Sequence, residues 1–387
     1  MTQLAQIPVV DVGPLVRGAG DCATTAAAIG RACRQLGFFY AVGHGVDPAL
    51  EARLFEQARR FFALPLEEKL AIRMAHGGAA WRGYFPVGAE LTSGRPDWKE
   101  GVYFGAELDV TDPRVRAGTP LHGPNLFPDL PGFRETVLDW IAAMTQLGHA
   151  LMRGIALSLD LPASWFADRY TADPLVLFRT FNYPAIPASD PDGWSVGEHT
   201  DYGVLTILLQ DDTGGLQVKL PRNDPPFPRS EPTPRNDQEL PRSEPKASGE
   251  PQNFPRSEPT PRNDQEFPRS EPTASGEPQN WIDAPPLAGA FVCNLGDMLD
   301  RMTGGRYRST PHRVRNAANR DRLSFPFFFD PNWNAEVRPI PGCEVAHDDR
   351  DTRWDGASVH AAGGSYGDYL LAKVSKVFPE LVRSVLR

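Results

Sequence analysis

The prolines of this chain are concentrated in one segment, residues 221–280, which holds 15 of the 39 prolines in the 387-residue sequence. Within it, positions 227–253 and 254–280 are two copies of one 27-residue sequence that differ at two positions. Proline at this density removes backbone donors and excludes a regular helix or a central strand. The copies also lack an apolar stripe with which one repeat unit could bury the next. We therefore expect 221–280 to be a disordered insertion, and the rest of the chain to encode the fold.

The charge and cysteine content exclude several classes of protein. The chain carries 40 Lys and Arg against 49 Asp and Glu, a net charge of −9, so neither nucleic acid nor an anionic membrane surface is expected as its partner. Its four cysteines form no CxxC pair, which argues against a disulfide scaffold. The N-terminal residues show no signal peptide, and no apolar run reaches the roughly 18 residues of a membrane span. We expect a cytoplasmic protein whose partner is a small molecule, and we leave its oligomeric state open.

The hydrophobic periodicity changes along the chain from helical to strand-like. Helical spacing covers residues 23–36, 47–62 and 134–159. After Leu175 the sequence breaks into short apolar strands separated by turn signals. Helices followed by many short strands indicate an α+β fold with an antiparallel barrel or sandwich.

This change divides the chain into an N-terminal region of helices and strands, 1–160, and a core of strands, 161–387, on which that region packs. The insertion interrupts the core between GLQVK (215–219) and WIDAPPLAGAFVCNLG (281–296). We expect these flanks to be two strands of a hairpin whose tip has been lengthened, since insertions are tolerated there. A final helical stretch, 368–378, is expected to pack outside the core.

Two histidines and an aspartate in the strand region have the pattern of a metal site. His199 and Asp201 lie two positions apart at the predicted start of a strand, where a period of two puts both side chains on one face. His312 lies in a later predicted strand, 111 positions after Asp201, or 57 once the two 27-residue copies are subtracted. Two imidazoles and one carboxylate form the facial triad that holds Fe(II) and leaves coordination positions open for O2. A closed structural zinc site would use four ligands, usually including cysteines. We expect Fe(II) at His199, Asp201 and His312.

A charged residue in an apolar strand indicates a second binding group. Arg322 and Ser324 alternate onto one face of the strand RLSFPFFF. A guanidinium in such a strand is costly to bury without an anion, and Arg with a neighbouring hydroxyl binds a carboxylate well. An iron triad beside a carboxylate receptor suggests a diacid such as 2-oxoglutarate, with its far carboxylate held by Arg322, Ser324 and Tyr183.

Other segments near these motifs receive plainer interpretations. Asn294–Asp297 is interpreted as a strand-to-turn element with no chemical role. Phe327 and Phe329 alternate away from Arg322 and are expected in the core. From the N-terminal region, GYF (83–85) and SGRPDWKE (93–100) are candidates for covering the mouth of the site.

Taken in order, four motifs resemble those of the isopenicillin N synthase-like family of Fe(II)/2-oxoglutarate-dependent dioxygenases. They are HTDYG (199–203), NLGDML (294–299), STPHRV (309–314) and DRLSFPFF (321–328). GFFYAVGHGV and FFALPLEEK are similar to the N-terminal region of that family, so the resemblance covers nearly all of the chain outside the insertion.

The resemblance implies a double-stranded β-helix (jelly-roll) core with flanking N-terminal helices. It implies iron on the matching His199, Asp201 and His312, and a 2-oxoglutarate carboxylate on Arg322 and Ser324. Tyr183 matches the family tyrosine that assists this carboxylate, whereas Phe181 stands where the family often has Asn.

The resulting hypothesis is a non-haem Fe(II)- and 2-oxoglutarate-dependent dioxygenase. It would hydroxylate, desaturate or cyclise a small molecule with release of succinate and CO2, and no catalytic residue is assigned beyond the iron site. One alternative is an Fe(II) oxidase without 2-oxoglutarate, of the isopenicillin N synthase or aminocyclopropane carboxylate oxidase type. Another is a non-enzymatic binding protein on the same fold. The sequence does not identify the substrate.

Overall fold

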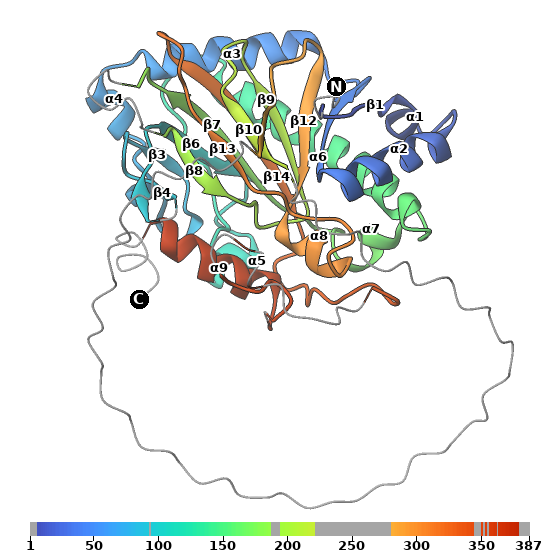
Figure 1. Ribbon diagram of the computed structural model, residues 1–387. Coiled ribbons are helices and arrows are strands. Elements are labelled where there is room, and N and C mark those ends of the chain that lie inside the picture. Colours follow the sequence, from blue (N-terminus) through green and yellow to red (C-terminus); the bar gives the residue numbers. More distant parts are fainter. Residues whose placement is uncertain are drawn as a thin grey trace, which may run out of the picture. The chain divides into compact units, whose positions relative to one another are not determined.

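In the described part of the chain the β-strands form two main sheets, drawn in Figure 1. The computed structural model describes residues 6–92, 94–186, 194–220, 280–343, 350, 353, 356–361 and 363–378. Within them, an eight-stranded sheet has the order β1-β2-β12-β9-β14-β7-β6-β3, and a four-stranded sheet has the order β11-β10-β13-β8. Neighbouring strands are antiparallel except for the parallel pair β1–β2.

The strands are short, as the spacing of turn signals predicts. Those of the large sheet are β1 (Val9–Asp11), β2 (Phe38–Val42), β3 (Gly83–Phe85), β6 (Glu100–Gly105), β7 (Leu175–Tyr183), β9 (Leu205–Gln210), β12 (Ala290–Leu295) and β14 (Arg322–Asp330). Those of the small sheet are β8 (Val196–His199), β10 (Leu216–Lys219), β11 (Trp281–Asp283) and β13 (His312–Val314). A separate pair is made by β4 (Leu91–Thr92) and β5 (Arg95–Pro96).

Most helices precede the core strands in the chain. They are α1 (Gly13–Arg17), α2 (Cys22–Gln35), α3 (Pro48–Phe62), α4 (Leu66–Leu70), the 3-10 helix η1 (Met74–Ala80), α5 (Pro113–Arg116), α6 (Phe133–Ser158), α7 (Trp165–Arg169), α8 (Asp297–Met302) and α9 (Tyr366–Val377). In the described part of the chain, no helix is both long and apolar enough to cross a membrane.

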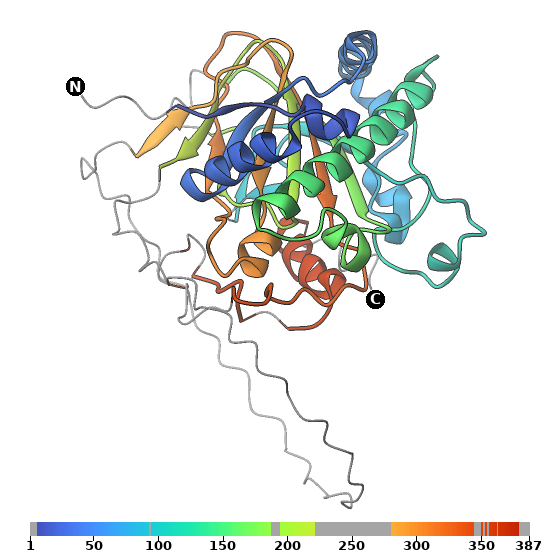
Figure 2. The same ribbon diagram turned by 90° about the vertical axis from the view of Figure 1, so that its right-hand side faces the viewer.

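The long helices form where the sequence predicts them, because the apolar stripes and the capping residues indicate the same helix boundaries. Asp47 accepts a hydrogen bond from the Ala49 amide and Pro48 opens the first turn of α3. Trp140 of α6 is fully buried and contacts Phe178 on the outward face of β7. Figure 2 shows α6 lying beside α2 over the large sheet. These helices therefore cover one face of the large sheet and leave its other face to the cavity.

The α+β class and the jelly-roll core are confirmed, with two sheets rather than a closed barrel. The flanks of the insertion pair as a hairpin, with Lys219 opposite Trp281. Of the insertion predicted over 221–280, only Asn280 lies within the described residues.

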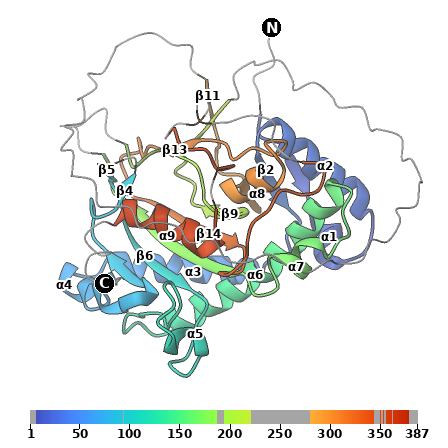
Figure 3. The same ribbon diagram turned by 90° about the horizontal axis from the view of Figure 1, so that it is seen from below.

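A cavity of about 540 Å³ draws its walls from both sheets. Thr206 of β9 and Ser324 of β14 line it from the large sheet, and His199 and His312 line it from the small sheet. Figure 3 shows α9 lying across one end of the sheets.

Helix α9 lies outside the two sheets, as the sequence predicts, and it also contributes to the cavity. Leu370 and Val374 are buried and line the cavity. A capping box at Ser365 and Asp368 begins the helix. The hydroxyl of Tyr366 donates to Asp330 at the end of β14, which fixes the helix to the large sheet.

Candidate metal centre and cosubstrate site

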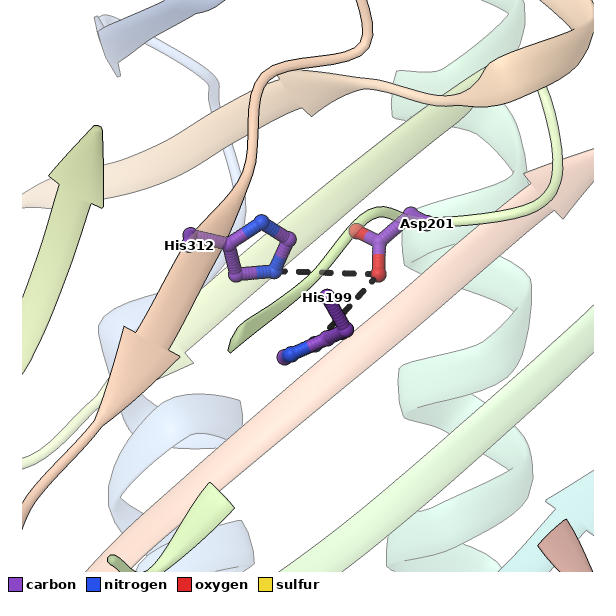
Figure 4. A group of neighbouring side chains, drawn as sticks. All are labelled: His199, Asp201 and His312. Atoms are coloured by element: carbon purple, nitrogen blue, oxygen red, sulfur yellow. Dashed lines mark ion pairs between the residues drawn. The ribbon is translucent and has the colours of Figure 1, made fainter. Parts of the chain in front are cut away.

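His199, Asp201 and His312 converge at one point, as Figure 4 shows, and all three line the cavity. Their candidate ligand atoms all lie within 4.8 Å of one another. The Nε2 atoms of His199 and His312 lie 4.0 and 3.7 Å from Asp201 Oδ1. A search of the described residues for three or more His, Cys, Asp or Glu side chains that could hold one metal ion finds this group.

The local structure around these residues differs from the sequence prediction. His199 is the last residue of β8, and Asp201 lies in the loop between β8 and β9, so the two do not start a strand. His312 begins β13 and pairs with His199 across the small sheet. The prediction that the three side chains meet is confirmed, but the reason is cross-strand pairing with a following turn, and not strand alternation.

Backbone carbonyls fix which nitrogen of each imidazole faces the cavity. Nδ1 of His199 lies 2.9 Å from the Gly197 carbonyl oxygen, and Nδ1 of His312 lies 3.2 Å from that of Thr310. A carbonyl can only accept, so each Nδ1 carries the proton and donates it. This arrangement leaves the Nε2 lone pairs available for a metal, as in many metal-binding histidines.

The Asp201 carboxylate is held from the opposite side. Its Oδ2 accepts hydrogen bonds from Thr206 Oγ1 and Asn294 Nδ2, both at 2.6 Å. Oδ1 is thereby turned toward the two histidines. Asn294 lies near the end of β12, in the strand-to-turn element that the sequence predicts, and its amide reaches the Asp201 carboxylate, a contact that was not predicted.

The pKa shifts of His199 and Asp201 suit the binding of a metal cation. Burial, together with the neighbouring His312, lowers the pKa of His199 to about 3, so its imidazole is neutral at pH 7. Burial alone would raise the pKa of Asp201, but His312, His199 and its two donors hold it below the usual value. Two imidazole nitrogens and one carboxylate oxygen match the donor set of non-haem Fe(II).

The three residues predicted to receive a carboxylate also lie together. Strand pairing places Arg322 of β14 opposite Tyr183 of β7, with the guanidinium carbon 4.8 Å from the centre of the tyrosine ring. The Ser324 and Tyr183 hydroxyl oxygens lie 3.1 Å apart. We call Arg322, Ser324 and Tyr183 the carboxylate clamp.

One nitrogen of the clamp has no partner. Arg322 is fully buried; its Nε donates to the Gly214 carbonyl and its Nη2 donates to Gln210 Oε1. Its Nη1 is buried without a hydrogen-bond partner. A buried guanidinium with a free donor fits an anionic group of a ligand.

The remaining cavity walls were only partly anticipated. Phe327 and Phe329 are buried in the core, as expected. Two N-terminal segments were considered for the mouth of the site. Gly94 and Lys99 of segment 93–100 line the cavity, whereas 83–85 is absent from its described lining.

Three further residues that line the cavity were not predicted. They are Glu90, Tyr103 and Arg179. Arg179 carries the same signal as Arg322, a cation within an apolar strand, and could have been found by it.

Comparison with known proteins identifies the family. The model of the 2OG-Fe(II) oxygenase superfamily matches residues 173–238 and 269–331, and that of the N-terminal region of non-haem dioxygenases in morphine synthesis matches 7–130. The chain belongs to the 2-oxoglutarate- and Fe(II)-dependent oxygenases.

Relatives match over almost the whole chain. A "probable iron/ascorbate oxidoreductase" of Dictyostelium discoideum is 46% identical, over 92% of this chain and 90% of the relative. The 1-aminocyclopropane-1-carboxylate oxidase of the same organism is 33% identical, over 98% and 97%. A homoarginine-6-hydroxylase of Arabidopsis thaliana is 30% identical, over 98% and 90%.

Among solved structures, a full-length Neurospora crassa protein in complex with 2-oxoglutarate and thymine superposes with a TM-score of 0.67 at 25% identity, over 95% of this chain and 96% of that chain. The protein is therefore an oxidoreductase, a dioxygenase that uses Fe(II) and 2-oxoglutarate to oxidise a small molecule. Neither an oxidase without 2-oxoglutarate nor a non-enzymatic binding protein is favoured.

Proposed function

We propose that His199, Asp201 and His312 hold the Fe(II) ion, and that the carboxylate clamp binds the far carboxylate of 2-oxoglutarate. The observation that carries the first assignment is the convergence of two Nε2 atoms and Asp201 Oδ1 at one place in the cavity wall. The free Nη1 donor of Arg322 supports the second.

When bound, iron and 2-oxoglutarate supply the oxidising chemistry, in which O2 converts 2-oxoglutarate to succinate and CO2 and the substrate is oxidised. The protein groups have supporting tasks. Thr206 and Asn294 orient Asp201, the carbonyls of Gly197 and Thr310 fix the tautomers of the histidines, and the clamp sets the direction of the diacid.

We infer that the substrate is an amino acid. Two of the relatives are named for amino acids, 1-aminocyclopropane-1-carboxylate and homoarginine. The cavity of about 540 Å³ is lined by Lys99, Arg179 and Glu90 as well as by apolar side chains, which suits a small charged molecule. The second candidate is a nucleobase, because the Neurospora crassa protein binds thymine in its crystal structure.

We also propose a cytoplasmic location. All four cysteines are free and three of them are buried. Buried thiols without disulfide partners are typical of proteins that work in a reducing compartment. Fractionation of cells that express the tagged protein would test this proposal, and recovery in a secreted or membrane fraction would contradict it.

The residue assignments can be tested by reconstitution under nitrogen. Fe(II) and 2-oxoglutarate added to the protein should give a metal-to-ligand charge-transfer band, and O2 should then yield succinate. His312→Ala should abolish the band and the succinate. The matched control His76→Ala changes an exposed histidine outside the cavity lining and should leave both unchanged. An unchanged band in His312→Ala would refute the iron assignment.

The substrate class can be tested by measuring succinate release with L-homoarginine, L-arginine, 1-aminocyclopropane-1-carboxylate and thymine in parallel. We expect an amino acid to raise the rate above that of the uncoupled reaction. Stimulation by thymine alone would favour the second candidate.

A further inference from the structure

A second buried guanidinium faces the same cavity as Arg322. Strand β7 alternates, so that Leu177, Arg179 and Tyr183 line the cavity, while Phe178 points outward to Trp140 of α6. Arg179 is only 8% exposed, and burial lowers its pKa. The mechanism proposed above gives this cation no task.

Arg179 differs in its partners from Lys99, another buried cation of the cavity lining. Lys99 lies 2.7 Å from Asp97 and 3.1 Å from Glu90, so two carboxylates neutralise it. In the described part of the chain, no carboxylate oxygen lies within 4.0 Å of the Arg179 guanidinium. A buried charge without an ion pair is costly, so an anion is expected to complete the site.

The contacts of Arg179 hold it in place, and the carboxylates of Glu90 and Asp330 act on its charge from beyond ion-pair distance. Its guanidinium carbon lies 3.4 Å from the centre of the Tyr103 ring, and its Nη1 donates to the Phe178 carbonyl at 3.5 Å. The Tyr103 hydroxyl donates to Glu90 Oε1 at 2.6 Å, which fixes the ring. A guanidinium stacked on a fixed ring is preorganised to bind a planar carboxylate with its free edge.

The position of Arg179 separates it from the clamp. It lies four residues before Tyr183 on the same strand face, about 13 Å away along β7. Strand β14 lies between β7 and β9, so Arg179 is also about 10 Å across the sheet from Thr206, the residue that holds Asp201. A diacid that joins the clamp to the triad is therefore expected to leave Arg179 for another anion.

We propose that Arg179 binds the carboxylate of the primary substrate, and that the enzyme therefore selects organic acids, amino acids among them, over their uncharged analogues. This inference rests on the proposed function, because it assigns the clamp to 2-oxoglutarate and the triad to iron. It makes Arg179 a specificity-determining residue and predicts that an amide of the same carbon skeleton is a poor ligand.

The test measures binding without turnover. Wild-type protein loaded with Fe(II) and 2-oxoglutarate under nitrogen is screened by thermal shift against the twenty proteinogenic L-amino acids, L-homoarginine, 1-aminocyclopropane-1-carboxylate, their carboxamides, and thymine. We expect at least one acid to raise the Tm, and its carboxamide to bind at least about 30-fold more weakly, as the loss of a buried charge-assisted pair implies.

Two variants complete the test. Arg179→Met should weaken binding of that acid by at least about 30-fold, and Arg179→Lys should recover part of the loss, because a charge remains. Both variants should keep the charge-transfer band of 2-oxoglutarate at wild-type affinity. Since the carboxamide arm uses the wild type, the proposal stays testable even if Arg179→Met does not fold.

Four results would overturn the proposal. They are equal binding of an acid and its carboxamide, unchanged acid binding in Arg179→Met, loss of 2-oxoglutarate rather than substrate binding in that variant, and a panel in which no acid binds the wild type. Failure of the proposed function looks different, because the wild type itself would then give no charge-transfer band.

Discussion

Replacement of Asn294 by alanine should weaken iron binding without contacting the ion. Asn294 is almost fully buried, and its Nδ2 lies 2.6 Å from Asp201 Oδ2, which also accepts from Thr206. A hydrogen bond to a charged group contributes about 1.5–3 kcal/mol, and each 1.4 kcal/mol is a factor of ten in affinity. Since Thr206 remains in place, we expect Asn294→Ala to raise the dissociation constant for Fe(II) by roughly 10- to 100-fold.

The assay is an anaerobic titration of the apoprotein with Fe(II) against a competing chelator. Asn125→Ala is a matched control, because Asn125 is also buried but bonds to Gly105 and Glu107, away from the triad. Both variants should lower the Tm, and only Asn294→Ala should change the iron affinity. An unchanged affinity in Asn294→Ala, or an equal change in both variants, would refute the reasoning that the Asn294 amide orients Asp201.

Three further predictions concern the clamp, a buried histidine and the insertion. Arg322→Met should retain Fe(II) binding but lose the charge-transfer band of 2-oxoglutarate; a band at wild-type affinity would contradict the clamp. Burial lowers the pKa of His44 below 6.5, so the unfolded state takes up more protons and the free energy of unfolding falls as the pH drops from about 7.5 to about 5.5. In urea titrations His44→Phe should lose less stability over this range than the wild type, and an equal loss would exclude His44 as a source. Replacing 221–279 with a short turn between Lys219 and Trp281 should leave iron affinity and succinate formation unchanged, since these residues already pair; a loss of either would mean that the insertion takes part in the site.

The amino-acid sequence predicts the parts of the site that depend on residue type and alternation. His199, Asp201 and His312 are unusual in their order and chemistry, and Arg322 and Ser324 share a face because β14 is a regular strand. Helix α3 was predictable because an N-cap, a proline and an apolar stripe agree. Residue identity and local spacing can be interpreted without the tertiary structure, whereas the approach of His312 to His199 and Asp201 depends on strand pairing.

The features that were missed depend on contacts between distant segments. Asn294 reaches Asp201 only because β12 pairs with β9 in the large sheet, and no spacing in the sequence encodes that pairing. Glu90, which comes from the N-terminal region, also reaches the cavity through tertiary contacts that no spacing in the sequence encodes. Helix α9 has an amphipathic pattern that predicts burial of one face, but the pattern does not say which surface it meets.

The position of α9 has a consequence for incompletely synthesised chains. All three proposed iron ligands and the clamp precede residue 325, whereas Leu370 and Val374, which line the cavity, are added to the nascent chain about 45 residues later. A product of premature termination between these points would carry a full set of ligands in an unfinished enclosure. In such a fragment the proposed iron site would lack the part of its enclosure that α9 supplies, so water would reach it more easily.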